Sequence, residues 1–143
     1  VITLGNDNSV NNNSSGHVCY AWHSVPGYSA FGTYTGNANT TDGPFIYTGF
    51  RPAFLLVKKI SGSADWYIWD STRSPNNENG TILSPNKSGV ENINTGNGVY
   101  FLSNGFKITN NKNDINANDS TLLYAAFAEN PYGGSNVAPA NAR

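Results

Sequence analysis

Charge and sulfur are both scarce in this sequence. Charged residues make up 12% of the 143 residues and the net charge is −1, so no basic stripe is present that could neutralise nucleic-acid phosphates. Cys19 is the one cysteine and methionine is absent. An intrachain disulfide is therefore impossible, and the paired cysteines of a structural zinc site are missing. We expect no nucleic acid, metal or cofactor as a partner.

Long apolar runs are absent as well. No apolar run of about 18 residues and no signal peptide occurs, so we expect no membrane insertion. A length of 143 residues suits one domain with one core. Because the chain starts at Val1 without an initiator methionine, we expect it to be a piece of a longer protein.

Turn-forming residues are what the chain has in abundance. Asn occurs 23 times, Gly 15, Ser 14 and Thr 11, and these residues favour tight turns because they tolerate positive φ or cap their own backbone. The apolar remainder is largely β-branched and aromatic, and no long segment shows the period of a helix. The composition predicts an all-β protein with long polar loops.

Alternation and turn punctuation predict nine short strands, at 17–24, 30–35, 44–49, 52–60, 65–71, 81–83, 99–102, 105–109 and 121–128. This pattern is typical of a two-sheet antiparallel β-sandwich, jelly-roll-like in character. The longest apolar strand, 52–60, is expected at the centre of its sheet. Ser103 to Gly105 predict a tight hairpin in which Asn-Gly supplies positive φ. Asn-rich segments at 6–13, 76–80, 92–97 and 110–118 are predicted loops, and the last is a candidate for mobility.

A faint repeat appears when the chain is shifted by 105 residues. Asn11, Asn13, Ser15, Ala21 and Pro26 then coincide with Asn116, Asn118, Ser120, Ala126 and Pro131, and Trp22 falls on Phe127. Two interpretations stay open. In a tandem array, residues 1–28 are the terminal strand and linker of a preceding repeat and 29–143 form the next sandwich domain. Alternatively, residues 1–28 are an N-terminal segment whose strand merely resembles the last one.

Five motifs occur in order along the chain: "YTGN" at 34–37, "GFRPAFLLVKK" at 49–59, "WYIWDSTR" at 66–73, "FLSNGFKI" at 101–108 and "LLYAAFAENP" at 122–131. This ordered set resembles a domain family found in tail-fibre and other structural proteins of bacteriophages, notably marine ones. The resemblance covers about 30–143, and "VCYAWHSVPGYSAFG" looks like the joint that precedes such a unit. It implies a virion component of the adsorption apparatus, with a homo-oligomer, in particular a trimer, and other fibre proteins as partners.

The segment "DWYIWDSTR" at 65–73 concentrates the candidate contact residues. Strand alternation places Trp66 and Ile68 on one face, and Tyr67 and Trp69 on the other. The family pattern makes Trp66 and Ile68 the buried pair and Asp70 with Arg73 a structural ion pair or turn lock. Tyr67 and Trp69 would then face outward, as a sugar-stacking platform, a subunit contact or packing within the domain.

The predicted ligand or protomer contacts are therefore Tyr67, Trp69 and Arg73, together with Tyr28 in the joint. If Tyr67 and Trp69 form a protomer contact, Trp69→Ser should weaken association more than it lowers the melting temperature.

Catalytic and metal patterns are weak. Asp65 and Asp70 point to opposite faces of a strand, so they cannot act as an acid and base pair, and we expect no enzyme. His17, Cys19 and His23 share a strand face but span too great a length to hold one ion. The segment 114–119 imitates the start of a calcium loop without its glycine or its terminal glutamate, so an Asx-rich turn is the favoured interpretation.

Three functions follow as hypotheses. The first is a non-enzymatic tail-fibre or receptor-binding domain of a phage virion that contributes to host attachment, located on the virion or otherwise extracellular. The second is a monomeric carbohydrate-binding module that takes a host surface glycan. The third is a filament or capsid-decoration subunit in which residues 1–4 complete a neighbour's sheet.

Overall fold

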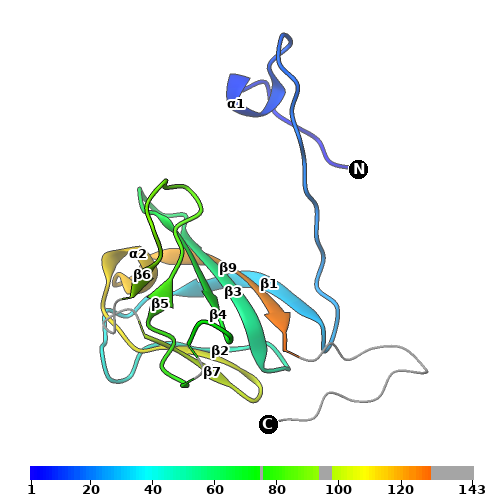
Figure 1. Ribbon diagram of the computed structural model, residues 1–143. Helices are drawn as coiled ribbons and strands as arrows, with labels where there is room; N and C mark the ends of the chain where they lie inside the picture. Colours follow the sequence, from blue (N-terminus) through cyan, green and yellow to red (C-terminus); the bar gives the residue numbers. More distant parts are fainter. Residues whose placement is uncertain (75, 94–97, 130–143) are drawn as a thin grey trace, which may run out of the picture.

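The computed structural model describes residues 1–74, 76–93 and 98–129. Within these residues it contains nine strands and two four-residue helices (Figure 1). The elements in chain order are α1 (Asn8–Asn11), β1 (Ser29–Thr35), β2 (Phe45–Tyr47), β3 (Pro52–Lys59), β4 (Trp66–Asp70), β5 (Thr81–Ile82), β6 (Asn92–Ile93), β7 (Val99–Leu102), β8 (Gly105–Ile108), α2 (Asn113–Asn116) and β9 (Thr121–Ala128). None of the described helices is long and apolar enough to cross a membrane.

The fold is an all-β sandwich, as the sequence predicts. One sheet has four strands in the order β1-β9-β3-β4, and the opposing sheet has three in the order β2-β8-β7. Every ladder in both sheets is antiparallel. The predicted central strand 52–60 appears as β3, which lies between β9 and β4. A small third sheet pairs β5 with β6.

The core fills the space between the two larger sheets. Alternation sends one side of each strand inward, and the buried residues from the four-stranded sheet meet those from the three-stranded sheet there. Phe106 of β8 contacts Tyr34 and Tyr124 edge to face, with ring centroids 6.2 and 5.4 Å apart. These aromatic contacts join the two layers.

The predicted hairpin at 103–105 joins β7 to β8, with Leu102 paired to Gly105. The expected positive φ is wrong, because neither Asn104 nor Gly105 has one. Gly105 is instead required by a close approach of backbone. A Cβ atom at this position would lie 2.1 Å from the carbonyl oxygen of Ile46 in the neighbouring strand β2, so only glycine fits.

The predicted loop at 110–118 contains the helix α2, whose Ile115 and Asn116 are buried. Asn116 Oδ1 accepts a hydrogen bond from the backbone N–H of Asn37 at 2.9 Å. Its Nδ2 donates to the backbone oxygens of Asn39 and Asn110 at 3.1 and 2.6 Å. The segment is therefore held by buried polar contacts, and the prediction of a loop is wrong for residues 113–116, which form α2.

The predicted strand at 17–24 is absent. These residues are extended, but within the described part of the chain they belong to no sheet. Figure 1 shows the N-terminal segment rising away from the sandwich, with α1 at its far end. The pattern "HVCYAWHS" has the alternation of a strand, and the structure gives it no neighbouring strand to pair with.

Candidate functional site

The strand β4 alternates as predicted, but the assignment of its two faces is wrong. Trp69, predicted to face outward, is 0% exposed and belongs to the hydrophobic core. Trp66 and Ile68, predicted as the buried pair, lie half-buried on the opposite side. Both alternate sets contain a tryptophan, so alternation alone does not decide which one faces inward. The sandwich decides it, because Trp69 pairs with Leu55 of β3 on the inner side.

Tyr67 lies beside Trp69, with ring centroids 5.9 Å apart. Its ring packs partly buried against the core, and its hydroxyl donates to Asp114 Oδ2 of α2 at 2.8 Å. Burial, together with this hydrogen bond to the carboxylate, raises the pKa of the Tyr67 hydroxyl. Tyr67 therefore anchors the helix α2 to the sandwich and Trp69 lies in the core, so the two side chains do not form an exposed stacking platform.

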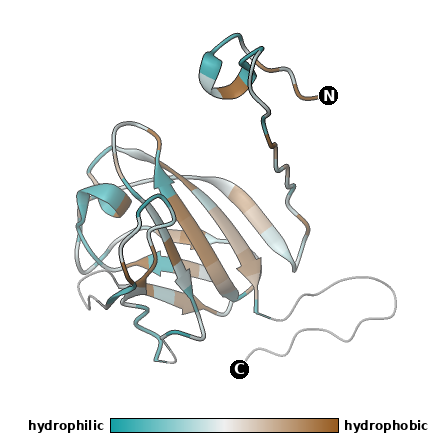
Figure 2. Ribbon diagram, turned by 45° about the horizontal axis from the view of Figure 1, so that its top comes forward, coloured by the Kyte–Doolittle hydropathy of each residue, from teal (hydrophilic) through white to brown (hydrophobic). Residues whose placement is uncertain are grey.

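The opposite side of the four-stranded sheet is the surface that stands out. Residues paired directly across antiparallel strands share a face, so the registers define an outer face with eight apolar side chains: Phe31, Phe54, Leu56, Trp66, Ile68, Leu123, Ala125 and Phe127. All eight are half-buried by their neighbours in the sheet. Figure 2 shows the brown of apolar residues along the central strands of this sheet. We call this surface the outer apolar face.

An aromatic cluster marks one end of the outer apolar face. The ring of Phe127 in β9 contacts Phe31 of β1 and Phe54 of β3 edge to face, with centroids 5.6 and 5.8 Å apart. Tyr28 packs on the same ring at 6.1 Å and remains 44% exposed. Of the four predicted contact residues, Tyr28 is the one that the structure places beside this surface.

The prediction from strand alternation assumed one buried face for each strand, and it therefore did not identify the outer apolar face. The informative signal is the continuous apolar character of "PAFLLV" in β3 and "LLYAAFA" in β9. An antiparallel strand with one solvated face usually alternates apolar and polar residues, whereas a run of apolar residues is typical of a strand covered on both faces. The run in β3 correctly predicted a central strand, and it also indicates a second apolar face.

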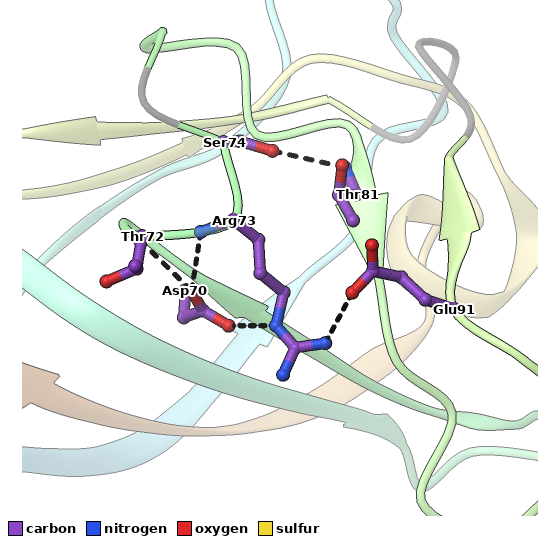
Figure 3. Close-up of polar contacts among 6 residues, drawn as sticks. All are labelled: Asp70, Thr72, Arg73, Ser74, Thr81 and Glu91. Atoms are coloured by element: carbon purple, nitrogen blue, oxygen red, sulfur yellow. Dashed lines mark hydrogen bonds and ion pairs between the residues drawn. The ribbon is translucent and has the colours of Figure 1, made fainter.

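Arg73, the remaining predicted contact residue, lies in an ion-pair network at the end of β4 (Figure 3). Its Nε lies 2.5 Å from Asp70 Oδ2, and its Nη1 lies 2.7 Å from Glu91 Oε2. Asp70 Oδ1 also accepts the backbone N–H groups of Thr72 and Arg73, at 3.0 and 2.8 Å. The predicted ion pair is confirmed, and Asp70 closes the turn that follows β4.

Other carboxylates have similar structural partners. Asp65 binds Lys87, and hydrogen bonds from Lys87 and Asn86 hold the pKa of its carboxyl group below the usual value. Arg51 pairs with Glu129 at 2.7 Å. Among the residues that the structure describes, no three His, Cys, Asp or Glu side chains gather where they could hold a metal ion.

The sequence profile of a family described as a domain of unknown function, DUF7483, matches residues 1–131. The chain belongs to this family. The match to DUF7483 includes the N-terminal segment as well as the sandwich, so both are part of what defines the family. No curated protein and no solved structure matches the chain.

Proposed function

We propose that this DUF7483 chain is a non-enzymatic structural protein of a bacteriophage virion, a tail-fibre or receptor-binding module that contributes to host attachment. The ordered motifs from "YTGN" to "LLYAAFAENP" support the virion assignment through their resemblance to such proteins. The outer apolar face supports the structural role. Contiguous apolar surfaces usually mark protein interaction sites, so this face is a candidate contact with another protein surface.

The outer apolar face is the observation that carries this proposal. A monomer buries these apolar side chains only in part, and polar residues are the usual choice on the solvent side of an antiparallel sheet. In a fibre or a similar assembly, a neighbouring surface would cover these side chains and gain about 25 cal/mol for each Å² of apolar area removed from water.

The use of the acidic side chains also favours a structural role. Five of the nine carboxylates form ion pairs with Lys or Arg, namely Asp42, Asp65, Asp70, Glu91 and Glu129. Asp114 accepts the hydroxyl proton of Tyr67 in a hydrogen bond. Carboxylates engaged in this way stabilise turns and loops, whereas acid and base catalysis needs a pair placed around a substrate.

The carbohydrate-binding alternative required Tyr67 and Trp69 at the surface as a platform for sugar rings. Trp69 is fully buried and Tyr67 hydrogen-bonds to α2. The observation that favoured sugar stacking has therefore been removed, and the virion proposal stands on the motifs and the outer apolar face.

The test is to locate the chain in particles of the phage whose genome encodes it. Purified particles are digested for peptide mass spectrometry, and antibodies raised against residues 1–143 are applied in immunogold electron microscopy. We expect peptides of this chain in the particles and gold at the tail fibres, with antibody pre-absorbed on the recombinant chain as the control. Particles that contain none of these peptides, alongside a host-cell extract that does, would overturn the proposal.

A further inference from the structure

The N-terminal arm, residues 1–24, carries apolar side chains that the described structure leaves in water. Val18, Tyr20 and Trp22 are 78%, 74% and 65% exposed. The rings of Tyr20 and Trp22 are stacked, with centroids 5.9 Å apart, so these alternate residues lie on one side of the extended segment. Figures 1 and 2 both show the arm leaving the sandwich near the start of β1.

The arm repeats the local structure of the unit formed by α2 and β9. Helices α1 and α2 are both four residues long and begin at Asn8 and Asn113, 105 residues apart, which is the offset of the sequence repeat. The residues that flank the two helices are extended at similar angles, with φ/ψ of −70°/133° and −61°/134° before them and −75°/129° and −64°/141° after them. The offset aligns Val18, Tyr20 and Trp22 with Leu123, Ala125 and Phe127, which are outer-face residues of β9.

The two units differ in their tertiary partners. In α2, Asn116 is 0% exposed and its side chain hydrogen-bonds to backbone groups of three residues, Asn37, Asn39 and Asn110. The equivalent Asn11 is exposed, and its side chain donates a local hydrogen bond to Gly5 O at 2.9 Å. The arm is therefore a second helix-strand unit without a sheet, and β9 shows what such a unit pairs with, since β9 runs antiparallel to β1.

Among the residues that the structure describes, no strand pairs with the outer edge of β1. It is the end strand of its sheet, and β9 pairs with one side of it only. The backbone N–H of Phe31 points away from β9, because it donates to Ser24 Oγ at 3.1 Å. By the alternation of an antiparallel ladder, the backbone groups of Thr33 and Thr35 face the same open edge.

This edge lacks the protection that edge strands normally carry. Proteins usually shield such strands with charged residues, proline or bulges. The sequence contains no Asp, Glu, Lys or Arg between Asp7 and Asp42, a range that includes residues 17–24 of the arm and all of β1. At the opposite end of the sheet, β4 is covered, since Ile68 and Leu83 exchange two backbone hydrogen bonds of 2.9 and 3.1 Å.

The arm does not continue as a hairpin on its own β1. Val25 and Ser29 exchange two backbone hydrogen bonds of 3.0 and 2.9 Å. The groups that would form the next rung are already engaged, because Ser24 Oγ accepts the N–H of Phe31 and the hydroxyl of Ser29 donates to His23 O at 3.1 Å. The ladder therefore ends at Val25. The backbone groups of Thr33 and Thr35 at this edge are then the ones that a strand from another chain could pair with.

We propose that residues 17–24 of one copy add as a fifth, antiparallel strand to the open edge of β1 in a second copy of this chain. The added strand completes backbone hydrogen bonding, as in other cases of strand addition, and Val18, Tyr20 and Trp22 extend the outer apolar face. Each copy has one arm and one edge, so the contact is head to tail and generates an open-ended array or a closed ring. The inference rests on the assembly role in the proposed function, and it replaces residues 1–4 with 17–24 as the donor strand.

Sedimentation velocity on residues 1–143 over a hundredfold concentration range tests the inference. We expect the wild-type chain to form species well above the 15.3 kDa of one chain. The arm variant Tyr20→Ser with Trp22→Ser and the edge variant Thr33→Lys should each remain monomeric, with association weakened at least tenfold. All three substituted side chains are exposed, so the circular dichroism spectrum should not change. Thr40→Lys adds the same charge in an exposed loop and should associate like the wild type.

Mixing the two defective variants gives the decisive result. The edge variant still has a normal arm and the arm variant still has a normal edge, so a 1:1 mixture should form one junction and stop at two chains. A monomeric wild-type chain, a variant that assembles normally alone, or a mixture that stays monomeric would each overturn the inference. If the chain is monomeric in sedimentation but is located at tail fibres by immunogold labelling, strand addition is refuted and the proposed virion role stays intact.

Discussion

The inner and outer faces of the four-stranded sheet have nearly the same kind of side chains and opposite surroundings. Leu55, Trp69 and Leu122 on the inner face are 0% exposed. Leu56, Ile68 and Leu123, which are their immediate neighbours in the same three strands, are only half-buried. Apolar residues on both faces of an antiparallel sheet indicate that both faces are covered in use. The three-stranded sheet covers one, and we assign the other to contact with a further protein surface.

The largest loss of stability is expected on removing Trp69, the tryptophan of the inner face. Trp69→Ala should lower the free energy of unfolding by about 3–5 kcal/mol, because it leaves a cavity between the sheets. Trp66→Ala, on the outer face of the same strand, should cost less than half as much. Urea unfolding followed by circular dichroism measures both, and equal costs would contradict the division between the two faces.

This result would reverse the expectation for Trp69 that followed from the sequence. An outward Trp69 would affect association more than stability. Since the side chain is buried, we now expect its removal to act mainly on the melting temperature, with any loss of association following from unfolding.

The inner face can be probed more gently at Tyr34, whose hydroxyl donates to the backbone oxygen of Ile115 at 2.7 Å. Tyr34→Phe should lower the free energy of unfolding by about 1–2 kcal/mol at neutral pH, because the buried carbonyl of Ile115 loses its partner. Tyr47→Phe, at a 68% exposed position in β2, should stay within about 0.5 kcal/mol of the wild type. Equal effects of the two substitutions would show that the hydroxyl of Tyr34 is not buried.

Alkaline pH should act on the same residue. Burial raises the pKa of the Tyr34 hydroxyl above its ordinary value, so the unfolded chain loses this proton at a lower pH than the folded chain. The stabilisation is therefore fully present below about pH 10 and is lost as the pH rises above it. Denaturation curves at pH 8 and pH 11 should show a smaller loss of stability for Tyr34→Phe than for the wild type, and an equal loss would contradict this assignment.

The smallest effect is expected at the solvent-exposed ion pairs at the end of β4. Arg73→Ala should cost about 0–1 kcal/mol, because the Arg73 side chain is 34% exposed and its ion pairs are screened by solvent. Asp70→Ala should cost more, since it also removes the acceptor for two backbone N–H groups. Melting temperatures in low and high salt measure the difference, and a larger cost for Arg73→Ala would show that the ion pairs outweigh the turn.

Local sequence patterns predicted most strands correctly because turn residues and alternation act within a few positions. The hairpin between β7 and β8 is an example, since "VYFLSNGFKI" contains both its strands and its turn. Sequence patterns did not predict the helix α2, because its stability depends on contacts with residues that are distant in the sequence. Asn116 is buried by contacts to residues 37 and 39, about 80 positions away. In an Asn-rich segment, local composition favours a loop.

The sequence by itself determined the all-β class, the positions of most strands, the Asp70–Arg73 ion pair and the repeat that relates the arm to the segment before and along β9. Tertiary structure alone decided which side of β4 is the core, that the arm stands apart from the sandwich, and that the edge of β1 is open. The physical reason is that alternation fixes which side chains share a face within one strand. Only the packing of one sheet against another, through contacts between distant residues, selects the face that is buried.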